Sequence, residues 1–351
     1  MTLSENQSAK KKAALLVLGG GAWGTALASR LANNPNITVK LWSRSEAIAK
    51  EINNLAVNRS YLPKISLSKN LDASSKLVES ISWLKNEPNC VVKFLFLAIP
   101  AKGFCQACSE LQRFNLDGFI FVSLCKGVIF FDGKNYFPSE VLKKMFPKND
   151  VCILSGPSFA TEVARGLPFA ISCSSKDIVL ARKSSVVLTS EGMRVYASSD
   201  NIGVEVSGAM KNVLAIASGV CDGLNLGYNA RASLITRGMA ETVRLGIALG
   251  AEKDTFLGLA GAGDLFLTTT GDLSRNRKVG KEIALGARLK TILEALGHVA
   301  EGVTNAPKLL NLGNSLNVSL PITEEVCLLL DEKKSASDAL GSLLNREPSD
   351  E

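Results

Sequence analysis

Histidine and cysteine are scarce in this sequence, which contains only His298 and 8 cysteines among its 351 residues. Cysteines this dilute do not form a disulfide framework. Cys105 and Cys108 have the C-x-x-C spacing, but a zinc site needs two further ligands at suitable spacing, and His298 is far away in the chain. We therefore expect no metal site, and we expect the thiols to be buried and unreactive in a reducing cytosol.

Long apolar runs are also missing, since no stretch reaches the roughly 18 apolar residues that a membrane span requires. Residues 10–12 are lysines before an apolar stretch, as in a signal peptide, but cleavage there would remove the glycine-rich segment that follows. The net charge of +7 suits a site for small anions. A nucleic-acid-binding surface would have a long basic patch interleaved with aromatic residues, and the basic residues of this sequence form no such patch. We expect a cytoplasmic protein without a membrane span or nucleic-acid partner, and residues 1–12 as a flexible tail.

A glycine-rich segment stands between a predicted strand and a predicted helix. Residues 13–18 are an apolar run typical of a buried parallel strand, and residues 25–32 have a helical pattern that ends at Asn33-Asn34-Pro35. Gly19, Gly21 and Gly24 fit G-x-G-x-x-G at this junction. Such glycines let the backbone approach a pyrophosphate, which binds the helix N-terminus. The segment predicts a dinucleotide site; the alternative is a glycine-rich turn without a ligand.

The alternation of apolar strands and helices continues to about Asp200 and then stops. Further strands are predicted at residues 37–42, 91–99, 119–124, 151–154, 169–172 and 194–196, and residues 202–344 have helical periods only. This order is typical of a doubly wound, mostly parallel sheet followed by a helical unit. We predict an α/β fold with a Rossmann-type dinucleotide-binding domain over residues 13–200 and an all-α substrate and catalytic domain over residues 201–345.

Three short motifs directly follow predicted strands. They are Ile99-Pro100-Ala101, Cys125-Lys126-Gly127 and the run from Ser155 to Ala160. Ligands bind outside the carboxyl ends of the strands in such sheets. Each motif alone fits an ordinary loop, but three at one edge of a sheet predict a ligand site, with Lys126 at a strand end.

Lys211 is the only cation in residues 204–217, a helical segment that is apolar nearly all round and is therefore expected to be buried. Burial lowers the pKa of a lysine towards the range needed for proton transfer. The alternative is a lysine whose stem packs while its ammonium group reaches water.

A second polar segment follows later in the helical region. A glycine-rich bend leads to Asp264, residues 268–270 are threonines, and Ser274-Arg275-Asn276-Arg277-Lys278 come next. A carboxylate, hydroxyls and a guanidinium could form a site for a polyol phosphate, because arginine donates two parallel hydrogen bonds to phosphate. A solvent-exposed helix start is the alternative for residues 275–278.

Together these motifs resemble the bacterial NAD(P)-dependent sn-glycerol-3-phosphate dehydrogenases over roughly residues 14–345, in the family's order. The matching segments are GGGAWGTALA, LCKGV, SGPSFATEVARGLP, GAMKNVLAIASGVCDGLNLGYNARASLITRG, GLAGAGDLFLT, SRNRKVG, EGVTNA and LPITEEV. The resemblance implies an active site between a Rossmann domain and a helical domain, usually in a homodimer. It also implies reversible reduction of dihydroxyacetone phosphate to sn-glycerol 3-phosphate by NADPH or NADH, which supplies glycerophospholipid synthesis.

The resemblance also implies residue roles, with Lys211 as the catalytic acid and base. The implied substrate-binding residues are Lys126, Gly156, Ser158, Lys211, Asn212, Asp264, Ser274, Arg275 and Asn276. The implied cofactor-binding residues are Gly19, Gly21, Ala22, Trp23, Gly24, Arg44, Lys126, Ala160, Arg275, Val299 and Glu301. Ala22 replaces a frequent serine of the family, and Thr161 replaces a residue that is often charged.

Two other functions remain open from the residues. A second type of two-domain dehydrogenase, acting on a hydroxyacid or polyol, would share the glycine motif and the lysine, although the GAGD and SRN motifs argue against it. A nucleotide sensor without catalysis would not need a lysine in an apolar helix.

The cofactor preference depends on Arg44. It stands about twenty residues after Gly24, where NAD-selective sites have an acid and NADP sites have an arginine. Glu46 is expected to begin the next helix, where an acid suits the helix dipole. We therefore expect NADPH to be used at least as well as NADH.

Overall fold

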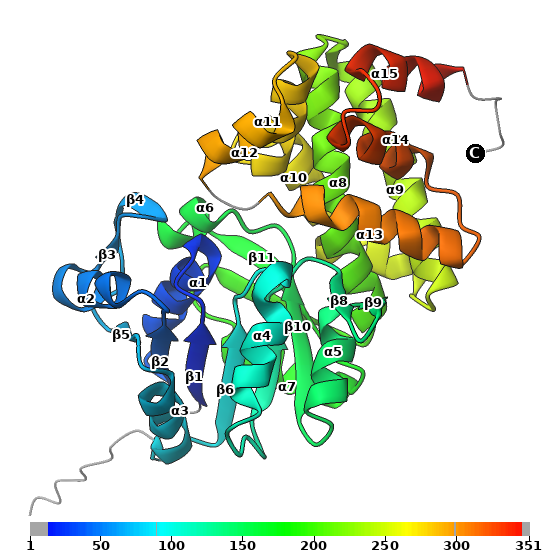
Figure 1. Cartoon of the computed structure of the whole chain (residues 1–351). Helices are drawn as coiled ribbons and strands as arrows, with labels where there is room; N and C mark the ends of the chain where they lie inside the picture. The colour runs from blue at the N-terminus through cyan, green and yellow to red at the C-terminus, as the bar shows by residue number, and fades with distance from the viewer. Residues whose placement is uncertain (1–12, 89, 298–299, 346–351) are drawn as a thin grey trace, which may run out of the picture.

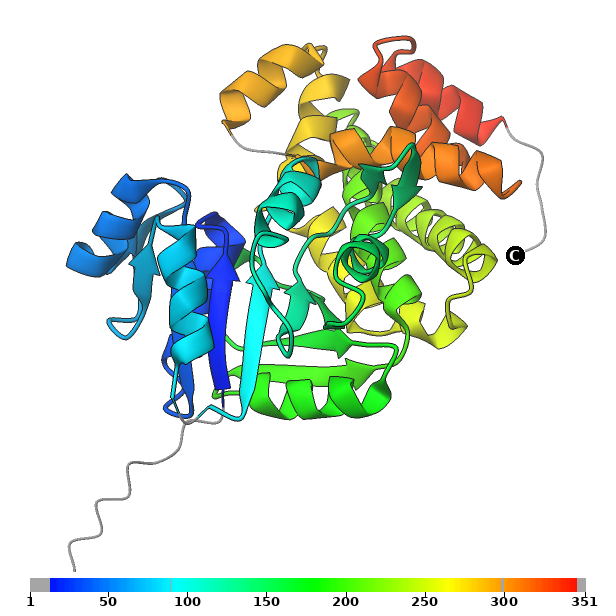
Figure 2. The same cartoon turned by 60° about the horizontal axis from the view of Figure 1, so that its bottom comes forward.

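Residues 13–88, 90–297 and 300–345 are described by the computed structural model of the chain. The chain up to Ser198 builds an eight-stranded sheet with helices on both faces, and the described elements from Asn201 onward are all helices (Figure 1). The helical part lies at one end of the sheet, as the view in Figure 2 also shows. The α/β class and the helical C-terminal part predicted from the sequence are confirmed. The division into domains at residue 200 stays a prediction.

The sheet has the strand order β12-β11-β10-β7-β6-β1-β2-β5. Neighbouring strands are parallel except for β10 and β11, which are antiparallel. Chain order runs outward from β1 in both directions, which is the doubly wound arrangement that the sequence predicts. The strands are β1 (Ala13–Leu18), β2 (Ile37–Trp42), β5 (Asp72–Ser74), β6 (Val92–Leu97), β7 (Ile120–Ser123), β10 (Asp150–Ser155), β11 (Phe169–Ser174) and β12 (Met193–Ser198).

Burial on both faces explains why β1 is apolar at every position. Ala13, Leu15 and Val17 pack on one face of the sheet, whereas Ala14, Leu16 and Leu18 pack on the other. The helices of this half are α1 (Ala22–Ala32), α2 (Glu46–Leu55), α3 (Leu77–Asn86), α4 (Ala101–Leu111), α5 (Pro138–Met145), α6 (Ala160–Ala164) and α7 (Ile178–Leu188). Two small hairpins, β3 (Val57–Asn58) with β4 (Leu62–Ser66) and β8 (Ile129–Phe131) with β9 (Lys134–Tyr136), extend it.

Helix α8 (Asn201–Gly223) is the central helix of the helical part, and all but two of its residues are buried. It is the one described helix long and apolar enough to cross a membrane, with a mean hydropathy of 1.2, but it lies inside the fold. Around it are α9 (Gly227–Ala248), the 3-10 helix η1 (Lys253–Leu257), the π-helical turn η2 (Leu259–Gly263), α10 (Asp264–Thr270), α11 (Arg275–Ala284), α12 (Leu289–Leu296), α13 (Glu301–Ser315), α14 (Pro321–Leu330) and α15 (Ala336–Leu344).

Two glycines let α8 and α11 touch backbone to backbone. A Cβ atom on Gly219 of α8 would lie 1.9 Å from the carbonyl oxygen of Arg277, and one on Gly280 of α11 would lie 1.9 Å from that of Ile216. Any larger residue would push the helices apart. This close packing brings the first turn of α11 next to the middle of α8, where Lys211 and Asn212 lie.

Some local predictions were wrong. Helix α1 begins at Ala22 instead of residue 25, so that Ala22, Trp23 and Gly24 form its first turn. The thiols were expected to be buried, but Cys90, Cys105 and Cys327 are only half-buried, whereas the other five are buried. All eight cysteines lie in the described residues and are free thiols. Burial raises the pKa of Cys108 to about 12, so the C-x-x-C pair is poorly suited to redox chemistry.

Candidate active site

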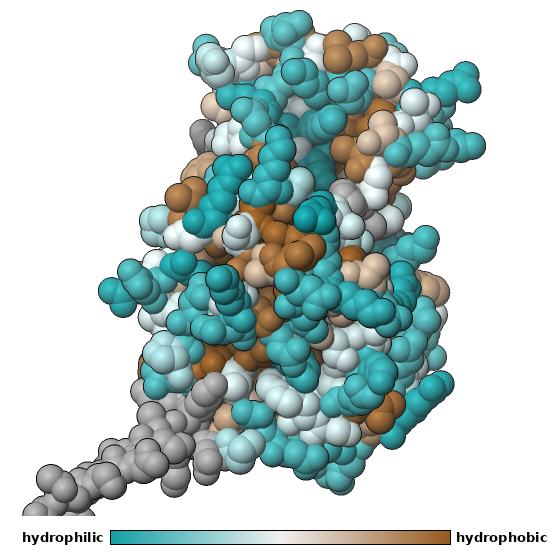
Figure 3. Space-filling model, turned by 90° about the vertical axis from the view of Figure 1, so that its left-hand side faces the viewer, coloured by the Kyte–Doolittle hydropathy of each residue, from teal (hydrophilic) through white to brown (hydrophobic). Residues whose placement is uncertain are grey.

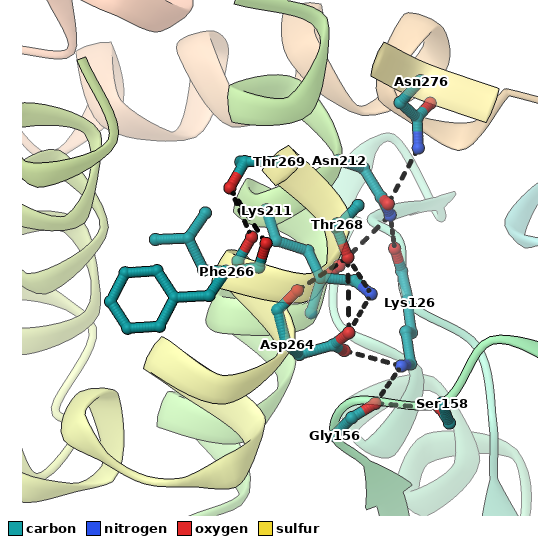
Figure 4. A network of polar contacts seen from close by, with 12 residues as sticks. Lys126, Gly156, Ser158, Lys211, Asn212, Asp264, Phe266, Thr268, Thr269 and Asn276 are labelled. Atoms are coloured by element: carbon teal, nitrogen blue, oxygen red, sulfur yellow. Dashed lines mark hydrogen bonds and ion pairs between the residues drawn. The ribbon is translucent and has the colours of Figure 1, made fainter. Parts of the chain in front are cut away.

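The carboxylate of Asp264 holds two lysine side chains from different parts of the chain (Figure 4). Its Oδ1 accepts a hydrogen bond from Lys211 Nζ at 2.5 Å, and its Oδ2 accepts one from Lys126 Nζ at 2.7 Å. The Asp264 side chain is 1% exposed, and those of Lys211 and Lys126 are 9% and 14% exposed. Three of the predicted site residues therefore form one buried ionic cluster.

The fold brings these groups together at the carboxyl ends of two strands. Lys126 lies in the loop after β7, and its ammonium group also donates to the carbonyl of Gly156, just after β10, at 3.0 Å. Gly156 has φ +139°, and a Cβ there would lie 3.0 Å from Ile171 Cα, so this turn requires glycine. Asp264 is the first residue of α10, where the helix dipole favours a carboxylate.

Lys211 has two hydrogen-bond partners inside the protein, and an ammonium group can donate to three. Besides Asp264, its Nζ lies 3.0 Å from Thr268 Oγ1, one turn along α10 from Asp264. The alternative of an ammonium group that reaches water is therefore wrong. Burial lowers the pKa of Lys211 to about 8, because the loss of hydration outweighs the attraction of Asp264. This pKa allows the group to give and take a proton near neutral pH.

At Asp264, the attraction of neighbouring charges has a larger effect on the pKa than burial has. Burial alone would raise the pKa of its carboxyl group, but Lys126 and Lys211 outweigh burial and hold that pKa below its usual value. Asp264 is therefore ionised whenever both lysines are protonated.

Further charges surround the cluster. Burial raises the pKa of Glu301, on the first turn of α13, while Arg275, Lys211 and Lys126 act to lower it. These effects place Glu301 within electrostatic reach of all three cations. Three basic side chains face two acidic ones here, and this balance favours an anionic ligand.

Asn212, Asn276 and Ser158, three of the remaining predicted substrate residues, are linked to this cluster by hydrogen bonds. Asn212 Nδ2 donates to the Lys126 carbonyl at 3.3 Å, and Asn276 Nδ2 donates to Asn212 Oδ1 at 2.9 Å. Ser158 Oγ donates to the Gly156 carbonyl at 2.9 Å. Ser274 caps α11 by accepting from the Arg277 N–H at 3.3 Å. Arg275 is exposed on the first turn of α11, as expected if residues 275–278 are a solvent-exposed helix start. Its positive charge nevertheless acts to lower the pKa of Glu301.

The glycine-rich loop before α1 fits a dinucleotide pyrophosphate. A Cβ on Gly19 would lie 2.3 Å from the Ala98 carbonyl oxygen, and one on Gly24 would lie 2.1 Å from that of Gly19. Above Gly21, by contrast, no atom of the described residues lies within 4 Å of such a Cβ. The first turn of α1 contains no acidic residue, and the buried Trp23 Nε1 has no hydrogen-bond partner within the described chain. The loop is thus closed on the protein side and open to an anion on the other.

The other predicted cofactor residues surround this loop in part. Arg44 is exposed directly after β2, and Glu46 begins α2 as predicted, with Ser45 as its cap. Ala160 begins α6, is half-buried and packs against the apolar core that includes α1. Val299, together with His298, lies outside the described residues. In Figure 3, apolar side chains gather near the middle of one face, at the height where the helical part meets the α/β part.

Thr268 belongs to the threonine run that the sequence analysis placed in a polyol-phosphate site, and it contacts Lys211 from one turn beyond Asp264. Two buried asparagines that touch this site were not predicted. Asn58 Nδ2 donates to the Gly20 carbonyl and to Thr25 Oγ1, both at 3.0 Å, and so supports the glycine loop from the β3–β4 hairpin. Asn305 bonds to the Lys126 loop from α13. The partners of these two asparagines are too distant in the sequence for a local pattern to reveal them.

Comparisons with known proteins show which family this chain is similar to. The family description "NAD-dependent glycerol-3-phosphate dehydrogenase N-terminus" matches residues 14–181, and the corresponding C-terminus description matches residues 200–341. A glycerol-3-phosphate dehydrogenase (NAD(P)+) of Thiobacillus denitrificans is 44% identical over 335 residues, covering 95% of this chain and 98% of the relative. The enzyme of that name from Methylibium petroleiphilum is 45% identical over 333 residues, covering 95% and 97%.

The fold also has a solved counterpart. The crystal structure of glycerol-3-phosphate dehydrogenase from Coxiella burnetii superposes with a TM-score of 0.87 at 34% identity, covering 95% of this chain and 99% of that one. Both matched descriptions, the two bacterial relatives and this structure agree along nearly the whole chain. The chain therefore belongs to the NAD-dependent glycerol-3-phosphate dehydrogenase family.

Proposed function

We propose that the protein reduces dihydroxyacetone phosphate reversibly to sn-glycerol 3-phosphate with NADPH or NADH. The observation that carries this proposal is the pairing of Lys211 with Asp264 next to Lys126, at the carboxyl edge of the sheet. This arrangement supplies a proton donor and positive charge at the same edge of the sheet as the glycine loop of α1. The relatives with this name add support.

Each residue has a chemical role in the proposed reaction. When bound, the reduced nicotinamide supplies the hydride that C2 of dihydroxyacetone phosphate receives. Lys211 then protonates the oxygen on C2, and in the reverse direction it accepts that proton. Lys126 provides positive charge for the oxygen as it becomes an alkoxide. Asp264 holds both ammonium groups in place, while Ser158, Ser274 and the second N–H of the Asn276 amide offer hydrogen bonds to the substrate. Both N–H groups of Asn212 are used by the carbonyls of Lys126 and Gly208.

An assay of NADPH oxidation with and without dihydroxyacetone phosphate tests the function. Oxidation that requires dihydroxyacetone phosphate supports the proposal. Oxidation with an oxoacid or an unphosphorylated ketose instead would favour another two-domain dehydrogenase. Binding of NADPH without turnover of any of these compounds would favour a nucleotide sensor.

Arg275 is proposed to bind the substrate phosphate. Arg275→Ala should raise KM for dihydroxyacetone phosphate about ten- to a hundredfold, because losing a charged hydrogen-bond partner costs roughly 1.5–3 kcal/mol. Activity towards unphosphorylated dihydroxyacetone should change much less. Steady-state kinetics with both substrates measure the difference, and Lys281→Ala, which removes an exposed cation from the same helix, is the control. An equal loss with both substrates would assign Arg275 to the cofactor or to the fold.

Arg44 is proposed to face the adenosine phosphate of NADPH. The wild type should use NADPH at least as well as NADH, and Arg44→Ala should lower kcat/KM for NADPH more than for NADH. The control is Lys50→Ala on α2, where Lys50 is exposed and pairs with Glu46 at 2.8 Å. A strong wild-type preference for NADH, or an equal effect of Arg44→Ala on both cofactors, would refute this assignment.

We further propose that the protein is cytoplasmic and that its product supplies glycerophospholipid synthesis. In this proposal the cofactor domain and the substrate domain divide near residue 200, and the protein is a homodimer. Large apolar side chains exposed on the helical part support association: Tyr228, Leu257, Phe266 and Leu273 are each more than half exposed. Phe266 points away from the ionic cluster in Figure 4, so a second copy could cover it without entering the site. A mass of 37.3 kDa by sedimentation at micromolar concentration would contradict the dimer.

A further inference from the structure

Asn305 clamps the loop that carries Lys126. Its side chain, on α13, is fully buried. Nδ2 donates to the carbonyl of Lys126 at 3.0 Å, and Oδ1 accepts from the N–H of Val128 at 3.2 Å. One amide therefore satisfies a backbone acceptor and a backbone donor on the two sides of Gly127, as a neighbouring strand would.

The approach of Asn305 is so close that it leaves no room for a side chain between its two partners. A Cβ atom on Gly127 would lie 2.9 Å from Asn305 Oδ1 and 3.0 Å from the Cβ of Ala101. The loop is therefore packed flat between α13 and the start of α4.

Other groups of the helical part hold the same loop. Asn212 of α8 donates to the Lys126 carbonyl at 3.3 Å, and Lys308, three residues after Asn305 on α13, donates to the Val128 carbonyl at 2.7 Å. Among these contacts, the Asn305 amide alone bonds on both sides of Gly127. The backbone of Lys126 is thus fixed by the helical part, although the residue lies in a loop of the α/β part.

The side chain of Lys126 is fixed separately. Its ammonium group is bound by Asp264 at 2.7 Å and by the Gly156 carbonyl at 3.0 Å. The two bonds fix the far end of a flexible stem, whereas the loop that Asn305 holds fixes its base. The ammonium group is therefore aligned only when both ends are held.

We propose that Asn305 is a positioning residue, which holds the Lys126 loop against α13 so that the Lys126 ammonium group is aligned with Asp264 and with the reacting oxygen of the substrate. The part that concerns the substrate rests on the proposed function. The clamp itself concerns only contacts within the chain.

Two substitutions at this position separate positioning from folding. Asn305→Ala removes both hydrogen bonds and should lower kcat/KM for dihydroxyacetone phosphate about tenfold or more. Asn305→Asp preserves the shape and the acceptor for the Val128 N–H, but an ionised carboxylate cannot donate to the Lys126 carbonyl, whereas a protonated carboxyl can. Its activity relative to wild type should therefore recover as the pH falls, while the relative activity of Asn305→Ala should stay constant.

Amide hydrogen exchange adds a readout that does not depend on turnover. In Asn305→Ala the peptide containing Val128 should exchange faster than in wild type, while peptides of β1 should be unchanged. Asn311→Ala is the control, because Asn311 also lies on α13 and accepts from Asn135 of the β8–β9 hairpin at 3.2 Å, away from Lys126. It should leave both the kinetics and the exchange at Val128 near wild type.

Several results would overturn the proposal. One is an Asn305→Ala enzyme with more than half the wild-type kcat/KM. Another is a pair of results: amide exchange in Asn305→Ala that is faster throughout the chain, and equal losses of kcat/KM in Asn305→Ala and Asn305→Asp at every pH. Together these results would show a general effect on the fold. If the wild type fails to reduce dihydroxyacetone phosphate, the proposed function fails, and local exchange at Val128 still decides whether the clamp exists.

Discussion

Lys211→Ala is expected to lower kcat about 10²–10⁴-fold, the usual contribution of a general acid or base, while leaving the affinity for NADPH near the wild-type value. The proton donor is lost, but the glycine loop at α1 is untouched. Lys211→Arg provides a comparison, because a guanidinium keeps the positive charge and does not release its proton in this pH range. Both variants should lose activity if proton transfer is the function of Lys211.

The pH dependence gives an independent check on Lys211. Its pKa is lowered to about 8, so the group changes from ammonium to amine as the pH rises through that value. Reduction needs the ammonium form, and kcat/KM for dihydroxyacetone phosphate should fall as the pH rises through about 8. Oxidation of sn-glycerol 3-phosphate needs the amine, and its kcat/KM should rise over the same interval. Retention of more than half the wild-type kcat by Lys211→Ala would end the acid–base assignment.

The main strands were predictable because each strand that is buried on both faces is an unbroken run of apolar residues in the sequence. Residues 13–18 are apolar throughout since both faces of β1 are covered, and the same reasoning identified the helix that buries Lys211. Short elements were harder. The strand β5 has three residues, too few for a pattern, and α1 begins two residues before Gly24, a residue that disfavours helix.

The partners within the site could be predicted only in part. Local patterns singled out Lys126, Lys211 and Asp264, and the resemblance implied their roles, but the bridge that Asp264 makes between the two lysines depends on how α10 packs on α8. Asn58 and Asn305 contact backbone groups 38 and 179 residues away. Such contacts are set by tertiary packing, and neither composition nor periodicity encodes them.

Asp264→Asn is also expected to have a large effect, both on the free energy of unfolding and on the pKa of Lys211. An amide has one acceptor oxygen, and its nitrogen is a donor. Whichever lysine faces that nitrogen therefore meets a donor in place of the carboxylate oxygen now 2.5 or 2.7 Å away. Breaking a buried ion pair by removing one partner costs about 3–5 kcal/mol. Denaturant unfolding of the variant and the wild type at pH 7 measures this loss.

The protonation effect distinguishes a functional carboxylate from a structural one. Asp264 raises the pKa of Lys211, so its removal should shift that pKa below about 8 and move the fall in kcat/KM for reduction to lower pH. Asp222→Asn is the matched control, because Asp222 also pairs with two cations, Arg231 at 2.9 Å and Arg277 at 2.6 Å, at the far end of α8. It should lower stability without moving the pH profile. An Asp264→Asn enzyme that is destabilised but has the wild-type pH profile would show that Asp264 supports the fold and does not set the protonation of Lys211.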